Sequence, residues 1–166
     1  MLEPLPLILV VEDEPEMASF IADVLKETGR YDAVTALSAK EASKILDKNK
    51  RFLGLAKNRV GCIVLDIKMP EKDGLQFLEE YRRTEPLTKL MPVIILSAYE
   101  DSEKWMMATS PGIGMVVGYL KKPVNKEQLI DTLDRVFHDE IGHMIDETRE
   151  RKYRPRPGLL GAKRKE

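Results

Sequence analysis

Five short, mostly apolar runs alternate with longer segments along this chain, and this alternation constrains the fold more than any other feature. The runs cover residues 7–11, 31–37, 62–66, 92–98 and 115–120. Apolar runs of this length that are rich in branched residues are typical of strands buried on both faces. Strands that alternate with helices need right-handed crossovers, which produce a parallel sheet with helices on both sides. The sequence therefore predicts an α/β fold with a doubly wound, five-stranded parallel sheet.

The segments between the runs carry helical spacing and capping signals. Pro15 suits a first helical position and Gly29 suits a helix stop. Ser38 with Glu41 predicts a capping box, and Asn125 with Gln128 predicts the cap of a last helix. Helices are expected over residues 15–29, 38–47, 75–81, 100–109 and 125–144, with a frayed helix end and a long loop over 48–60.

The composition favours one soluble domain followed by a tail. A chain of 166 residues that is 43% hydrophobic can bury a core without disulfides or a structural metal. A single cysteine excludes an internal disulfide and a zinc site built on several thiolates. No apolar run approaches the roughly 18 residues that a membrane helix needs, and the start of the chain lacks the cationic region of a signal peptide. We therefore expect a cytoplasmic protein without membrane contact.

Polar side chains follow four of the five predicted strands. They are Glu12 and Asp13, Asp66, Ser97 and Lys122. Each alone is an ordinary turn residue, but the carboxyl ends of parallel strands meet at one edge of a sheet, where ligands bind in this class of fold. Three converging carboxylates repel one another unless a cation lies among them, and oxygen ligands without His or Cys favour Mg²⁺. A hydroxyl and an ammonium facing such an ion suit the oxygens of a phosphoryl group.

Four motifs in combination carry a resemblance to a known family. They are LILVVEDEP, IVLDIKMPEKDG, VIILSA and YLKKP, within roughly residues 6–138. With these motifs the chain resembles the response regulator receiver domain, the phosphoacceptor module of two-component signalling. The resemblance implies a flavodoxin-like sheet with strand order 2-1-3-4-5. It also places a receiver domain over residues 1–138 and an extension over residues 139–166.

The resemblance implies a role for each polar residue at the strand ends. Asp66 would accept the phosphoryl group. Glu12 and Asp13 would hold Mg²⁺ together with Asp66, and the backbone carbonyl of Lys68 would supply a further ligand. Gly74 lies eight residues after Asp66, as in the family.

The remaining implied roles concern the switch. Ser97 and Lys122 would contact the phosphoryl oxygens, and Tyr119 matches the aromatic residue that moves inward when Ser97 is drawn to the phosphoryl group. The peptide bond between Lys122 and Pro123 is often cis in the family, a form that costs little only before proline.

The function that the resemblance implies is that of a phosphorelay response regulator. A sensor histidine kinase or a phosphotransfer protein would supply the phosphoryl group, and the domain would signal through a conformational switch to a protein partner. It would not act as an enzyme on external substrates, although it catalyses its own phosphorylation and dephosphorylation. A hydrolase with a D-x-D motif is disfavoured because position 68 is Lys.

Residues 139–166 leave alternatives open. Residues 149–166 hold eight Lys and Arg against two Asp and Glu, a net charge of +6, which leaves −7 on the rest of the chain. A basic tail without a helix-turn-helix pattern keeps a nucleic-acid-binding regulator as the alternative function. The apolar stripe of the last helix runs through Ile141 and Met144, which we expect either to pack on a second copy or a partner, or to fray into solvent. Pro155 and Pro157 limit the helix to about residue 153.

Overall fold

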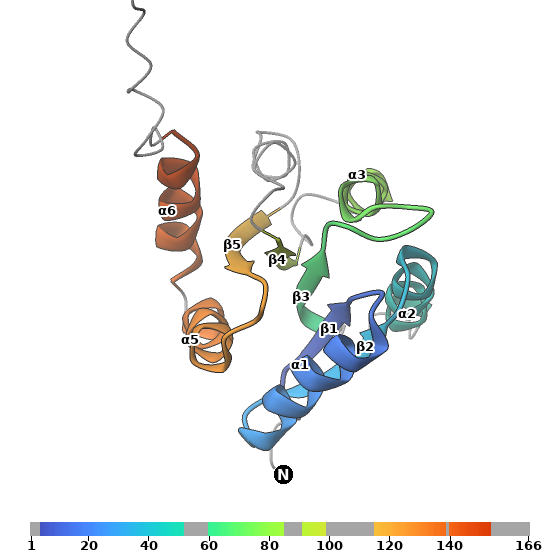
Figure 1. Ribbon diagram of the computed structural model, residues 1–166, viewed down its shortest axis with the longest axis horizontal. Coiled ribbons are helices and arrows are strands. Elements are labelled where there is room, and N and C mark those ends of the chain that lie inside the picture. The colour runs from blue at the N-terminus through green and yellow to red at the C-terminus, as the bar shows by residue number, and fades with distance from the viewer. Residues whose placement is uncertain (1–3, 52–59, 85–90, 99–114, 139, 154–166) are drawn as a thin grey trace, which may run out of the picture.

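A computed structural model describes residues 4–51, 60–84, 91–98, 115–138 and 140–153 (Figure 1). The first half of this chain contains β1 (Leu7–Val11), α1 (Pro15–Glu27), β2 (Asp32–Ala36), α2 (Ala39–Arg51) and β3 (Val60–Asp66). The second half contains α3 (Gly74–Thr84), β4 (Pro92–Ser97), β5 (Met115–Lys121), α5 (Lys126–Phe137) and α6 (Ile141–Tyr153). The helix predicted over residues 100–109 lies outside the described residues.

The five strands form one parallel sheet with the order β2-β1-β3-β4-β5. This order and the doubly wound α/β class are those predicted. The chain adds β2 on one side of β1 and then β3, β4 and β5 on the other side. The carboxyl ends of β1 and β3 therefore flank the point at which ligands bind in open α/β sheets.

The sheet separates two apolar clusters. Ile63 and Leu65 of β3 join the cluster made with α2 and α3, whereas Cys62 and Val64 join the cluster made with α1, α5 and α6. Alternating side chains on one strand thus serve both clusters, because successive Cβ atoms point to opposite faces. Cys62 is fully buried and packs within the second of these clusters.

One predicted strand boundary is wrong by two residues. β3 begins at Val60, two residues before its expected start, because Gly61 is accommodated by a register shift between Leu7 and Ile8 of β1. A Cβ at Gly61 would lie 3.0 Å from the ring of Phe137, so the packing leaves little room for a side chain at this position. The glycine interrupts the apolar pattern by which the start of the strand is predicted. α2 continues to Arg51, within the segment over 48–60 that is predicted to hold a helix end and a loop.

The capping box at the start of α2 forms with one change. Ser38 Oγ accepts the backbone N–H of Glu41 at 3.2 Å, as predicted. The Glu41 carboxylate accepts the backbone N–H of Leu37 at 2.8 Å, one residue earlier than a capping box places it. The cap of α5 forms as expected, because Asn125 Oδ1 accepts the Gln128 N–H at 2.9 Å.

The predicted single helix over residues 125–144 is wrong. α5 ends at Phe137, and the Glu140 N–H bonds to the carbonyl of Arg135 at 3.2 Å before α6 begins at Ile141. The turn lets α6 lie beside β5 rather than project away (Figure 1). Met144 is 2% exposed and belongs to the core of its own chain, so the surface that it finds is not that of a second copy or a partner. α6 extends to Tyr153, the last described residue.

Candidate functional site

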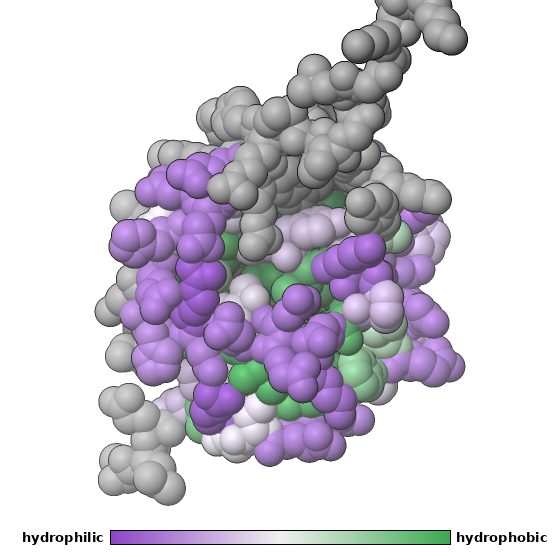
Figure 2. Space-filling model, turned by 60° about the vertical axis from the view of Figure 1, so that its left-hand side comes forward, coloured by the Kyte–Doolittle hydropathy of each residue, from purple (hydrophilic) through white to green (hydrophobic). Residues whose placement is uncertain are grey.

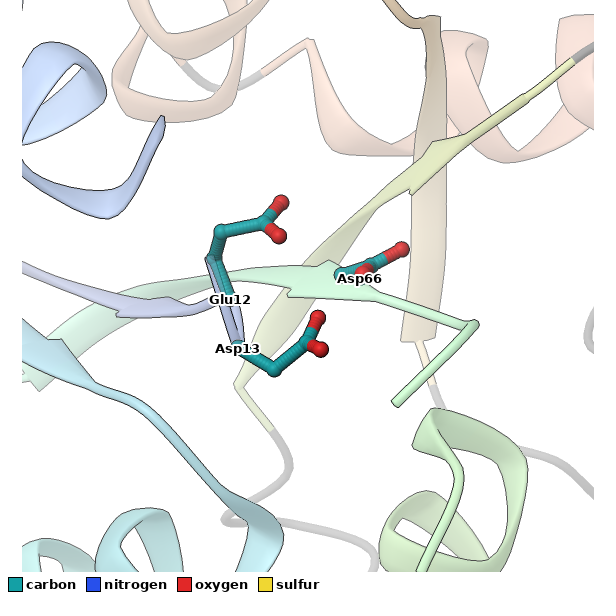
Figure 3. Close-up of side chains that lie close together, drawn as sticks. All are labelled: Glu12, Asp13 and Asp66. Carbon is teal, nitrogen blue, oxygen red and sulfur yellow. The ribbon is translucent and has the colours of Figure 1, made fainter. Parts of the chain in front are cut away.

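Three carboxylates converge at the carboxyl ends of β1 and β3 (Figure 3). Glu12 and Asp13 directly follow β1, and Asp66 is the last residue of β3. One oxygen from each lies within 4.8 Å of the others. Glu12 is fully buried, Asp66 is 2% exposed and Asp13 is half-buried. The structure therefore brings together the three acids that the sequence predicted to meet.

Lys122 joins this cluster from the end of β5. Its Nζ lies 2.7 Å from Glu12 Oε2 and 3.1 Å from Asp66 Oδ2. The Lys122 N–H donates to the carbonyl of Ser97 at 2.9 Å, which fixes the backbone next to β4. The peptide bond before Pro123 is cis, as the resemblance implied.

The charges of the cluster shift the pKa of two groups. Burial, together with the negative charge of Glu12, raises the pKa of Asp66 to about 6, although Lys122 opposes this shift. Burial alone would lower the pKa of Lys122, but hydrogen bonding and attraction to Glu12 and Asp66 outweigh burial and raise it. Lys122 therefore stays protonated, and Asp66 is mainly ionised at neutral pH.

The three carboxylates fit a divalent cation. Three carboxyl groups face one ammonium in a largely buried space, so acidic oxygens outnumber the cation. Glu12 Oε2 is buried and has the ion pair with Lys122 but no well-aligned hydrogen bond. An all-oxygen set with spare lone pairs suits Mg²⁺ better than a softer metal.

The loop after β3 holds Asp66 in place. The Lys68 N–H donates to Asp66 Oδ1 at 3.2 Å, and the Gly74 N–H donates to the carbonyl of Ile67 at 2.9 Å. A Cβ at Gly74 would lie only 2.4 Å from the backbone oxygen of Asp66, so the loop closes only over a glycine. Glu71 adopts a φ of 63°, which is uncommon for a residue other than glycine. The sequence did not reveal this conformation, because Glu carries no signal for it.

Ser97 and Tyr119 lie near the cluster on β4 and β5. Ser97 pairs with Lys121 across the sheet, and Leu96 pairs with Asp66, so Ser97 lies at the same edge as the acids. Ser97 is 1% exposed, and its hydroxyl donates to the carbonyl of Ala98 at 3.0 Å. The hydroxyl of Tyr119 lies 3.5 Å from the same carbonyl. Ser97 thus lies at the same edge of the sheet as the three acids and Lys122, and Tyr119 lies near it on β5.

Residues 8–134 match the family described as "Response regulator receiver domain". The chain is 32% identical over 127 residues to "Transcriptional regulatory protein GlrR" of Escherichia coli (strain K12), a match that covers 76% of this chain and 25% of that protein. The chain thus spans about a quarter of the length of this relative.

Two solved structures resemble the fold over most of the chain. A response regulator receiver domain protein from Clostridium thermocellum is 27% identical with a TM-score of 0.64, and the match covers 88% of this chain and 98% of that one. Chemotaxis protein CheY4 of Vibrio cholerae is 28% identical with a TM-score of 0.64, covering 80% of this chain and 99% of that one. Among the described helices, none has the length and apolar character needed to cross a bilayer.

Proposed function

Because the chain belongs to the response regulator receiver domain family of two-component signalling, we propose that Asp66 accepts a phosphoryl group from a phosphohistidine. The donor would be a sensor histidine kinase or a phosphotransfer protein. The observation that carries this proposal is the placement of a buried carboxylate, Asp66, beside two further acids and one ammonium. Carboxylates in such a position can attack phosphorus while neighbouring charges balance those of the phosphoryl oxygens.

The transfer would exchange one bond to phosphorus for another. An oxygen of Asp66 forms a bond to phosphorus as the bond to the histidine nitrogen breaks, and the imidazole leaves with the electron pair of that bond. With a pKa of about 6, Asp66 is mostly ionised at pH 7 and needs no base to activate it. The product is a mixed anhydride, which water can hydrolyse.

Glu12, Asp13 and Asp66, with the backbone carbonyl of Lys68, would hold the metal. When bound, Mg²⁺ would neutralise part of the charge on the phosphoryl oxygens. Lys122 would exchange its contact with Asp66 for a phosphoryl oxygen.

The signal would leave the site through Ser97 and Tyr119. Ser97 donates to the carbonyl of Ala98, and Tyr119 lies near the same oxygen, so a phosphoryl group that attracts the Ser97 hydroxyl changes the surroundings of both side chains. This rearrangement would alter contacts with a protein partner. The nucleic-acid alternative depends on the tail after residue 153, which lies outside the described residues, and it stays a prediction.

The proposal is tested by locating an added phosphoryl group. The protein is incubated with Mg²⁺ and a small phosphodonor, and intact mass followed by peptide mapping identifies the modified residue. We expect labelling of the wild type and of Glu71→Gln, a control for loss of an acid in the same loop, but not of Asp66→Asn. Equal labelling of Asp66→Asn and wild type would reject Asp66 as the acceptor.

A further inference from the structure

The loop between β3 and α3 contains a residue in an unfavourable backbone conformation. The loop runs from Asp66, the last residue of β3, to Gly74, the first residue of α3 (Figure 1). Within it Glu71 has a φ of 63°, in the left-handed region that residues other than glycine rarely adopt. Such a conformation persists only where neighbouring contacts impose it. The contacts that impose the shape of this short loop therefore also place Asp66 and the carbonyl of Lys68.

Backbone hydrogen bonds hold the part of the loop that lies next to β3. Ile67 is fully buried, and its carbonyl accepts the N–H of Met69 at 3.2 Å and the N–H of Gly74 at 2.9 Å. The second bond brings the first residue of α3 beside Asp66, with no room for a Cβ between them. The position of Asp66 therefore depends on where α3 begins.

A reciprocal pair of side-chain bonds sets the start of α3. Asp73 Oδ1 accepts the N–H of Gln76 at 3.0 Å, and Gln76 Oε1 accepts the N–H of Asp73 at 3.2 Å. This arrangement is a capping box, with Asp as the cap and Gln three residues later. The carbonyl of Asp73 accepts the N–H of Phe77 at 3.1 Å, so the helical bonds begin at this residue. Gln76 thus binds the loop through the backbone group directly before Gly74.

An ion pair joins the loop to a later turn of α3. The ammonium of Lys72 pairs with the carboxylate of Glu80. Lys72 directly follows Glu71, so the ion pair restrains the residue next to the left-handed one. Glu80 is exposed, and an exposed ion pair adds little to the overall stability of a fold. Its effect here is to restrict the direction in which the loop can move.

We propose that Gln76, supported by Glu80, is a positioning residue for the acidic site. Both side chains bind the loop, and the loop carries Asp66 and the carbonyl of Lys68, which would bind Mg²⁺. Without the contact from Gln76, a fraction of the molecules holds the loop in other conformations, and the affinity for Mg²⁺ falls with the fraction that remains competent. The consequence for phosphotransfer rests on the proposed function of Asp66.

The first test measures Mg²⁺ binding to the full chain by isothermal titration calorimetry, without a phosphodonor. Gln76→Ala should bind Mg²⁺ at least about threefold more weakly than wild type, the change expected when one hydrogen bond no longer favours the competent loop. Gln76→Glu keeps an acceptor oxygen, as Glu does in a capping box, and should bind Mg²⁺ within about twofold of wild type. Unchanged affinity in Gln76→Ala, or an equal loss in Gln76→Glu, would overturn the proposal. A wild type that binds no Mg²⁺ would overturn it as well.

Gln128→Ala is the matched control for Gln76→Ala. Gln128 has the same place in α5 as Gln76 has in α3, because it lies three residues after the cap, Asn125. α5 packs on the opposite face of the sheet from α3, on the side of the molecule that Figure 2 brings forward, where hydrophilic residues cover much of the surface. Gln128→Ala should keep the wild-type affinity for Mg²⁺. An equal loss of affinity in both variants would assign the effect to helix stability rather than to the contact with Asp73, and would overturn the proposal.

The second test separates positioning from a loss of stability. The rate of labelling by a small phosphodonor is measured against Mg²⁺ concentration, at a temperature at which circular dichroism shows every variant folded. The Mg²⁺ concentration for half-maximal rate should rise at least about threefold in Gln76→Ala and rise also in Glu80→Ala. It should stay unchanged in Glu79→Ala, an exposed neighbour on the same helix.

The two tests distinguish this proposal from the proposed phosphorylation. An unchanged half-maximal concentration in Gln76→Ala, in a chain that is labelled on Asp66, would overturn the positioning role alone. If calorimetry gives the expected pattern but the wild type is not labelled, the proposed function of Asp66 fails, and the positioning of the acidic site by Gln76 stands.

Discussion

The Nζ atom of Lys122 lies 3.1 Å from Oδ2 of Asp66, and the same nitrogen lies 2.7 Å from Glu12. One ammonium from the end of β5 thus balances part of the charge of two buried carboxylates from β1 and β3. Neither partner is near it in sequence, so only the parallel sheet creates this contact. The stability of the metal-free site should depend on this nitrogen.

Lys122→Ala should destabilise the metal-free protein at neutral pH. Loss of the ammonium leaves Glu12 and Asp66 buried without their counter-charge, at a cost of about 1–3 kcal/mol. Urea denaturation in the presence of a chelator measures this cost. Lys121→Ala, an exposed neighbour, is the control and should change stability by less than about 0.5 kcal/mol. Equal effects of both variants would mean that the contact with the acids contributes nothing specific.

Asp66→Asn should stabilise the metal-free protein near pH 7. Folding raises the pKa of Asp66 from 3.8 to about 6, so between these values the folded state binds more protons than the unfolded state does. The ionised carboxylate therefore lowers stability progressively as pH rises from about 4 to 6, by about 3 kcal/mol at most. Asn cannot ionise, so the variant lacks this pH dependence. Its gain in the free energy of unfolding should therefore be full above about pH 6 and vanish below about pH 4.

Denaturation of wild type and Asp66→Asn across this pH range measures the difference. Asp23→Asn, an exposed acid on α1, is the control and should follow the wild-type curve. A constant offset between wild type and Asp66→Asn at all pH values would contradict the electrostatic origin of the gain.

Mg²⁺ should raise the unfolding temperature of the wild type. An ion that binds only the folded state stabilises it by about 2.7 kcal/mol at a concentration one hundred times its dissociation constant. Asp13→Ala removes a half-buried ligand and should abolish the shift while leaving the metal-free fold intact. Differential scanning calorimetry with and without Mg²⁺ provides the comparison. An unchanged shift in Asp13→Ala would place the ion elsewhere.

The fold and the site positions were predictable from sequence because each rests on a local pattern. Buried strands appear as apolar runs, and in a parallel sheet every residue that follows such a run lies at the same edge. This pattern predicts that one edge of the sheet holds Glu12, Asp13, Asp66, Ser97 and Lys122. It could not reveal that Lys122 contacts Glu12 as well as Asp66, since that depends on side-chain conformation.

The break between α5 and α6 could not be predicted from the same pattern. Phe137 and Ile141 are four residues apart, so the apolar stripe continues through residues 138–140 as if the helix did. Tertiary contacts decide the outcome: Arg135 binds Glu140 and Glu147, and Thr148 contacts β5. The strength of a local helical pattern carries no information about such contacts.

Two glycines should respond in opposite ways to a methyl group. Gly74→Ala should destabilise the protein by about 1–3 kcal/mol, because the new Cβ would lie 2.4 Å from the Asp66 carbonyl oxygen and would force the backbone apart. Gly142→Ala, in the first turn of α6, meets nothing within 4 Å and should stabilise the helix by up to about 1 kcal/mol. Urea denaturation measures both changes, and phosphodonor labelling should fall in Gly74→Ala alone, since only that substitution displaces the backbone of Asp66. If Gly74→Ala kept wild-type stability and labelling, the loop would have another way to close, and its glycine would not be needed to position the acceptor.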